Sequence, residues 1–258
     1  MESWQKRGVQ GSLRVQPGRK GAEKLSEISI KGFQGTSLLD FPGRVASLVF
    51  TGGCNLTCPF CHNPGLVLDP GSFPDYPIDQ LLADLQKRSS FIDGVVISGG
   101  EPTLDAGLPA FLRQLKQLGL QIKLDTNGLL PQVIEALLDE KLIDYLAIDI
   151  KTTPERYSEL HTRPVSRDGL LRSIELAKTA TIEAEFRTTC VPCLVSDAEI
   201  EQLGELLQGA HLWVLQQFVP EHSLEQEWQE FDSYPKEKLE NFARTAEGFV
   251  ERVLLRGI

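Results

Sequence analysis

The chain has 258 residues and a formal net charge of −10, from 26 basic and 36 acidic side chains. This balance argues against general nucleic-acid binding, which needs clustered Lys and Arg. The apolar runs are too short to span a membrane, and five cysteines, an odd number, do not suit a disulfide framework. We therefore expect a soluble, cytoplasmic protein that binds neither nucleic acid nor membrane.

The first 25 residues differ from the rest of the chain. They carry six basic and two acidic side chains, with Gly and Pro and almost no apolar periodicity. They lack the apolar core that a signal peptide needs. We expect a disordered basic tail with no specific role, the alternative being an arm that contacts an acidic partner. Residues 26–258 show no linker, so we expect a single domain there.

From residue 28 the pattern is that of alternating strands and helices. Residues 28–33 alternate as a short strand does. Apolar, β-branched runs then predict strands at 45–50, 94–98, 121–125, 145–150, 184–189 and 212–218. Helical patterns lie at 78–88, 108–118, 131–140, 167–179, 197–207 and 235–255.

This alternation predicts βαβ units around a parallel sheet. The pattern alone leaves an open doubly wound sheet and a partial barrel as alternatives. In both architectures, functional residues gather where the strands end.

The strand at 45–50 leads into a loop with three cysteines. Cys54, Cys58 and Cys61 have C-x3-C-x2-C spacing, which lets three thiolates bind one iron–sulfur cluster or one zinc ion. Structural zinc sites and electron-carrying clusters use four protein ligands, so three leave one metal with an open position for chemistry. The weaker alternatives are zinc with His62 as its fourth ligand, at an unusual spacing, and a disulfide, which three cysteines cannot satisfy.

With Phe60 in the aromatic position, this loop resembles the C-x3-C-x-aromatic-C hallmark of the radical S-adenosylmethionine (SAM) superfamily. The stretch from SLLDFPG at 37–43 to CHNP at 61–64 resembles glycyl-radical-enzyme activases. It is most similar to the anaerobic ribonucleoside-triphosphate reductase activating proteins. The resemblance implies an α/β fold, a partial (β/α)6 TIM-like barrel with a short N-terminal strand extension. It also implies that the three cysteines bind a 4Fe–4S cluster and that SAM binds its open iron.

The second strand of the series ends in Gly99, Gly100 and Glu101. Two glycines allow a close approach of backbone to a ligand, although a simple Gly-Gly turn is the structural alternative. The resemblance implies that this segment contacts the amino group of SAM.

The third and fourth strands end in Asp125-Thr126-Asn127 and in Asp149-Ile150-Lys151. A plain Asp/Asn turn explains the first segment, and a structural Asp149–Lys151 pair explains the second. The resemblance instead implies that Asp125, Thr126 and Asp149 hold a monovalent cation beside SAM and that Lys151 lies near the cofactor.

Arg187, on the fifth strand, stands where the activases place an arginine near the SAM carboxylate, which a planar guanidinium suits. A surface salt bridge is the alternative for this residue. Gln217 is expected to line the adenosine pocket, and Phe60, His62 and Asn127 complete the expected cofactor-binding set. No catalytic residue is expected beyond the cluster and SAM.

Cys190 and Cys193 form a C-x2-C pair that departs from the related activases. Two thiols cannot hold a second cluster. A structural or incidental role is the preferred interpretation, and a redox or disulfide role is the alternative.

The resemblance implies cleavage of SAM to methionine and a 5′-deoxyadenosyl radical, with an electron from a low-potential donor such as flavodoxin or ferredoxin. The implied target is a glycine Cα hydrogen of a partner glycyl radical enzyme, anaerobic ribonucleotide reductase. One alternative is a radical SAM enzyme acting on a small molecule, such as a 7-carboxy-7-deazaguanine synthase. The other is a non-catalytic zinc or electron-carrying module.

Overall fold

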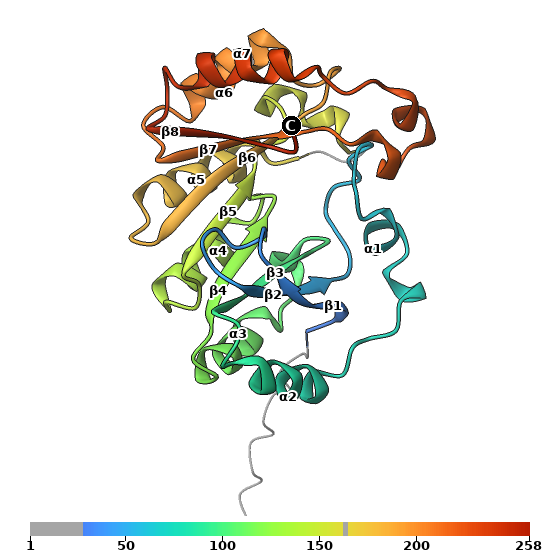
Figure 1. The fold of residues 1–258 in the computed structure, drawn as a ribbon, viewed down its shortest axis with the longest axis vertical. Coiled ribbons are helices and arrows are strands. Elements are labelled where there is room, and N and C mark those ends of the chain that lie inside the picture. The colour runs from blue at the N-terminus through green and yellow to red at the C-terminus, as the bar shows by residue number, and fades with distance from the viewer. Residues whose placement is uncertain (1–27, 162–164) are drawn as a thin grey trace, which may run out of the picture.

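The computed structural model describes residues 28–161 and 165–258, so the predicted basic tail lies outside the described residues. Within them, eight strands form one sheet in chain order, β1 to β8 (Figure 1). The strands are β1 (Ile30–Ser37), β2 (Ala46–Thr51), β3 (Gly94–Gly99), β4 (Gln121–Thr126), β5 (Tyr145–Asp149), β6 (Glu183–Cys190), β7 (Leu212–Gln217) and β8 (Arg252–Arg256). β1 is antiparallel to β2, and every later pairing is parallel.

Helices alternate with the strands as the sequence predicts, except that α1 was not predicted and α7 is shorter than predicted. They are α1 (Pro64–Leu68), α2 (Ile78–Arg88), α3 (Leu108–Gln117), α4 (Pro131–Asp139), α5 (Arg167–Thr179), α6 (Asp197–Leu206) and α7 (Lys236–Ala246). Short 3-10 turns lie at Pro70–Ser72, Pro102–Leu104, Pro154–Glu159, Pro220–His222 and Gln226–Glu230. None of these described helices has the length and apolar character needed to cross a membrane.

Local chemistry explains where several helices begin. α4 begins with Pro131, whose missing N–H costs nothing in a first turn. α6 begins with a capping box, in which the Ser196 backbone N–H donates to Glu199 Oε2 at 2.8 Å. These two ends are therefore fixed by a few residues of sequence.

The predicted helix at 235–255 is wrong over its second half. α7 ends at Ala246, and residues 252–256 form β8, which is parallel to β7 and aligns Leu212 with Arg252. A run as short as residues 253–255 fits a buried strand as well as a helix, so periodicity could not decide. Pairing with β7 satisfies the backbone polar groups of this segment. The sheet therefore has seven parallel strands rather than six.

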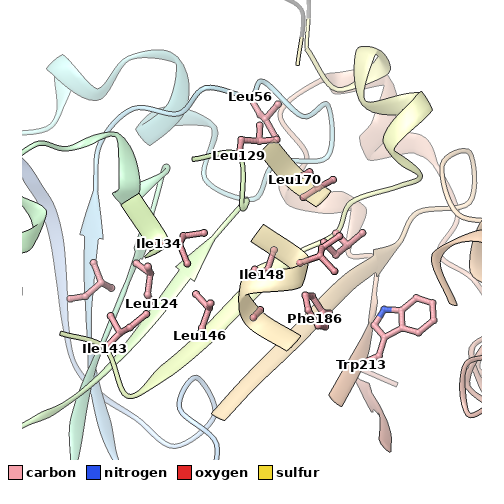
Figure 2. Packing of buried hydrophobic residues seen from close by; sticks show 14 of the residues in the cluster. Leu56, Leu124, Leu129, Ile134, Ile143, Leu146, Ile148, Leu170, Phe186 and Trp213 are labelled. Atoms are coloured by element: carbon pink, nitrogen blue, oxygen red, sulfur yellow. The ribbon is translucent and has the colours of Figure 1, made fainter. Parts of the chain in front are cut away.

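The outer face of the sheet packs on the helices. Figure 2 shows Leu124, Leu146 and Ile148 on the strands, close to Ile134 of α4 and Leu170 of α5. All five side chains are at most 1% exposed. This layer is the main hydrophobic core.

The inner face is filled at the end where the parallel strands begin. Phe41, from the loop between β1 and β2, is fully buried, and its ring centroid lies 5.7 Å from that of Tyr145. Leu48, Val96 and Ala147 complete this smaller cluster. Burial of both faces of the single continuous sheet suits a partial TIM-like barrel, and the division into one domain stays a prediction.

Candidate active site

A cavity of about 260 Å³ lies at the ends of the parallel strands. Every residue that the sequence predicts for the site lines it: Cys54, Cys58, Phe60, Cys61, His62, Gly99, Gly100, Glu101, Asp125, Thr126, Asn127, Asp149, Lys151, Arg187 and Gln217. The lining also includes Leu56, Asn63, Val67, Ser98, Thr189 and Gln216, which sequence reasoning missed. Thr189 and Gln216 stand near the ends of β6 and β7, so the expectation that functional residues gather at strand ends could have found them. Val67 carries no such sequence signal.

Backbone hydrogen bonds fix the shape of the cysteine loop, both within the loop and to the residues that follow it. Gly53 N–H donates to Leu66 O at 2.7 Å, and Cys61 N–H donates to Cys58 O at 2.9 Å. Phe60 is buried, with Trp228 6.1 Å from its ring centroid and Lys151 Nζ 5.9 Å from it. The loop thus has a defined shape in which all three cysteines face one cavity.

The two glycines after β3 are required by the cysteine loop itself. Gly100 N–H donates to Thr51 O at 2.9 Å, and Glu101 N–H donates to Gly53 O at 2.8 Å. A Cβ on Gly100 would lie 1.9 Å from Gly53 O, and one on Gly99, where φ is 114°, would lie 2.4 Å from Thr51 O. The two glycines therefore allow a close approach to the backbone of the cysteine loop, and their contact with SAM stays a prediction.

Glu101 joins the end of β3 to the end of β4. Its side chain is buried, and it accepts hydrogen bonds from Thr126 Oγ1 and Asn127 N, both at 2.7 Å, and from Thr103 N and Thr103 Oγ1. Burial raises the pKa of Glu101, and these hydrogen bonds oppose the rise. Because all four partners donate, the site suits the ionised carboxylate, which only accepts.

Around Asp125 and Asp149, which also line the cavity, ion pairs replace neutral hydrogen bonds. Arg187 donates from Nε to Asp149 Oδ1 at 2.7 Å and from Nη1 to Asp125 Oδ2 at 2.9 Å. Lys123 Nζ lies 2.6 Å from Asp125, and Lys151 Nζ lies 3.4 Å from Asp149. Burial alone would raise the pKa of Asp149, but Arg187 and Lys151 hold that pKa well below its ordinary value.

The same network continues below the cavity. Lys123 is fully buried and also lies 3.5 Å from Glu185, which in turn pairs with Arg256 of β8 at 2.8 Å. The strand that sequence analysis missed therefore supplies the last cation of the network. Arg187 belongs to this buried network and not to a surface salt bridge.

Gln217 makes a hydrogen bond inside the protein, and Cys190 and Cys193 are not bonded to each other. Gln217 Nε2 donates to Tyr234 O at 2.6 Å, although the residue also lines the cavity. Cys190 is buried and Cys193 is exposed, and both are free thiols. The disulfide alternative is absent from this structure, and the redox alternative stays a prediction.

Comparison with known proteins assigns the family. Residues 48–207, more than half of the chain, match the Radical SAM superfamily. The chain belongs to the radical SAM superfamily. This membership implies a 4Fe–4S cluster and SAM.

Relatives with activase names match most of the chain. A "Putative glycyl-radical enzyme activating enzyme" of Methanocaldococcus jannaschii is 31% identical over 234 residues, which cover 89% of this chain and 96% of that protein. The pyruvate formate-lyase-activating enzyme of Clostridium pasteurianum is 28% identical, over 76% of this chain and 82% of that protein. A 7-carboxy-7-deazaguanine synthase of Hyperthermus butylicus is 36% identical, but only over 35% of this chain and 38% of its own length.

Solved structures confirm the fold. Streptococcus suis SuiB bound to S-adenosylmethionine superposes with a TM-score of 0.59, at 16% identity, over 80% of this chain and 48% of that one. TYW1 with a lysine-pyruvate adduct gives a TM-score of 0.58 over 79% of this chain and 73% of that one, also at 16% identity. The predicted radical SAM core fold is therefore confirmed.

The three cysteines fit the cluster that a radical SAM protein carries. Burial raises the pKa of Cys54 to about 11 and that of Cys58 to about 12, so binding of a cluster would have to release the protons of these thiols. Three thiolates that face one cavity are the donor set that an iron–sulfur cluster with one open iron would use. Zinc with His62 as its fourth ligand stays the alternative.

Proposed function

We propose that this protein is a radical SAM activase that generates a glycyl radical on a partner enzyme. The observation that carries the proposal is the 31% identity to a relative with an activase name over 96% of that relative's length. Our finer proposal for the partner is an anaerobic ribonucleoside-triphosphate reductase, on the motif SLLDFPG at 37–43. The electron donor that we propose is a low-potential protein such as flavodoxin or ferredoxin.

The chain would hold the cluster through Cys54, Cys58 and Cys61. Together with SAM, the bound cluster supplies reductive cleavage of the sulfonium to methionine and a 5′-deoxyadenosyl radical. The protein contributes binding and protection. Apolar side chains such as Leu56 and Val67 line the cavity and help to exclude water.

Lys151 and Arg187 are the groups that we propose for the SAM carboxylate. Both line the cavity and carry positive charge. Burial alone would lower the pKa of Lys151, but Asp149 raises that pKa well above its ordinary value, so the ammonium stays protonated. A planar guanidinium and a fixed ammonium suit recognition of a carboxylate. For Gly99 and Gly100, the backbone that borders the cavity is the part that we propose for the SAM amino group.

The cation site at Asp125, Thr126 and Asp149 also remains part of the proposal. Arg187 already bridges the two carboxylates, and the Thr126 hydroxyl donates to Glu101. A further cation therefore needs additional negative charge, which the SAM carboxylate would bring. We expect SAM to bind more tightly in potassium chloride than in choline chloride of equal concentration, and equal affinities would remove the cation from the proposal.

The test of the function uses the partner directly. The anaerobically reconstituted, reduced protein is incubated with SAM and the oxygen-sensitive ribonucleotide reductase of the same organism, and a glycyl radical is sought by EPR. We expect a radical that requires both proteins and SAM, and none with Cys58→Ala, which should not load iron. SAM cleavage without a radical would contradict this partner and leave another glycyl radical enzyme or a small molecule as the target, the latter represented by the shorter match to 7-carboxy-7-deazaguanine synthase.

A further inference from the structure

Asn127 directly follows β4 and uses its side-chain amide and its backbone N–H in contacts inside the protein. Its side chain Nδ2 lies 2.7 Å from Asn55 Oδ1 and 3.8 Å from Cys54 Sγ. Its Oδ1 accepts from Leu129 N at 3.1 Å, and its backbone N–H donates to Glu101 Oε2 at 2.7 Å. The residue is 4% exposed. Sequence analysis placed Asn127 in the cofactor-binding set, and this geometry brings its side chain close to a cysteine of the loop.

The orientation of the amide is fixed by its neighbours. The oxygen must face Leu129, because that backbone N–H can only donate. The two hydrogens of Nδ2 therefore face the Asn55 oxygen and the Cys54 sulfur, one for each acceptor. Leu56 N–H supplies a second donor to the same sulfur, at 3.4 Å. Cys54 is thus a sulfur with two N–H donors directed at it.

We propose that Asn127 is a positioning residue that tunes the cluster: its amide donates to the Cys54 sulfur and thereby raises the reduction potential of the cluster. Reduction adds one electron, and so one negative charge, to the cluster. Hydrogen bonds to its sulfurs stabilise the reduced form more than the oxidised form. The hydrogen bond from the Asn127 backbone N–H to Glu101 helps to hold the Asn127 side chain next to Cys54. The inference rests on radical SAM membership alone and is independent of which partner or substrate the enzyme serves.

The experiment is a redox titration of the reconstituted cluster without SAM, followed by EPR of the reduced form. The first variant is Asn127→Leu, which has a similar volume and no donor. At a potential that half-reduces the wild-type cluster, we expect the ratio of reduced to oxidised cluster to fall about threefold to tenfold; tenfold corresponds to about 59 mV for one electron. Asn127→Asp keeps the acceptor for Leu129 and adds negative charge, so its ratio should fall at least as far.

The matched control is Asn63→Leu. Asn63 also lines the cavity, but its Nδ2 donates to Gly99 O at 3.4 Å and not to a sulfur. We expect its cluster to keep the wild-type potential.

The outcomes separate the alternatives. Fully loaded Asn127→Leu and Asn127→Asp clusters at the wild-type potential would overturn the proposal, as would an equal shift in Asn63→Leu. Weaker SAM binding by Asn127→Leu at an unchanged potential would return Asn127 to a SAM contact. If Asn127→Leu alone fails to load iron, Asn127→Asp decides; failure of both to load would also count against the proposal, since it assigns Asn127 to tuning and not to assembly.

Discussion

The two sides of the cavity hold their buried carboxylates in different ways. Glu101 is surrounded by neutral donors, namely two hydroxyls and two backbone N–H groups. Asp125 and Asp149 are held by Arg187, Lys123 and Lys151, which are cations. On the Glu101 side, negative charge is solvated but not neutralised, whereas on the other side positive charges match or exceed it. The cavity lining thus contains a cation-rich group of residues, suited to an anionic group of a ligand, and a second group, around Glu101, that contacts the cysteine loop.

The largest difference should follow from removal of a buried cation. Arg187→Met leaves two buried carboxylates without their shared partner, and loss of one partner from a buried ion pair costs about 3–5 kcal/mol of unfolding free energy. Urea denaturation of the anaerobic protein would measure this cost. The control is Arg172→Met, which breaks an exposed pair with Glu135 and should cost less than about 1 kcal/mol. Equal losses from both variants would show that the buried network contributes no more than a surface pair.

The next largest effect tests the close backbone contact between Gly100 and the cysteine loop. Gly100→Ala forces a methyl group against Gly53 O, which belongs to backbone and cannot move aside without displacing the cysteine loop. We expect the free energy of unfolding to fall by about 2–3 kcal/mol, measured by denaturation, and iron loading to be reduced, measured by iron analysis. Gly71→Ala is the control, because the nearest atom to its new Cβ is a side-chain oxygen at 3.6 Å. Normal iron content in Gly100→Ala would contradict the tight fit of these two loops.

The sequence predicted the members of this site better than their contacts. Strand ends and the cysteine spacing were enough to collect Gly100, Asp125 and Arg187, because parallel strands bring their ends to one edge. What Gly100 meets depends on the register between β2 and β3, which no local pattern encodes. β8 was missed because its short apolar run fits two periodicities, and its Arg256 could not be connected to Glu185 without the fold.

A smaller effect should come from the neutral donors around Glu101. Thr103→Val keeps the shape of the side chain but removes one hydroxyl donor, so three of the four hydrogen bonds remain. We expect the free energy of unfolding to fall by about 1.5 kcal/mol, the lower end of the contribution of a hydrogen bond to a charged group. Urea denaturation measures it, with Thr179→Val, an exposed threonine, as the control. A loss as large as that of Arg187→Met would show that one neutral donor to Glu101 stabilises the fold as much as the cation shared by Asp125 and Asp149.

The smallest effect is a difference in pH dependence, and it has opposite signs on the two sides. The folded pKa of Asp149 is depressed despite burial, because of Arg187 and Lys151, so its stabilising contribution is present above the unfolded pKa of about 4 and is lost as the pH falls further. Burial raises the folded pKa of Glu101, so the folded protein binds that proton more tightly and the contribution of Glu101 declines as the pH rises through the folded pKa. Denaturation from pH 7 down to pH 3 should therefore show the advantage of wild type over Asp149→Asn shrinking below about pH 4, while its advantage over Glu101→Gln grows on acidification. Parallel curves for the two variants would mean that neutral donors and cations hold these carboxylates equally well.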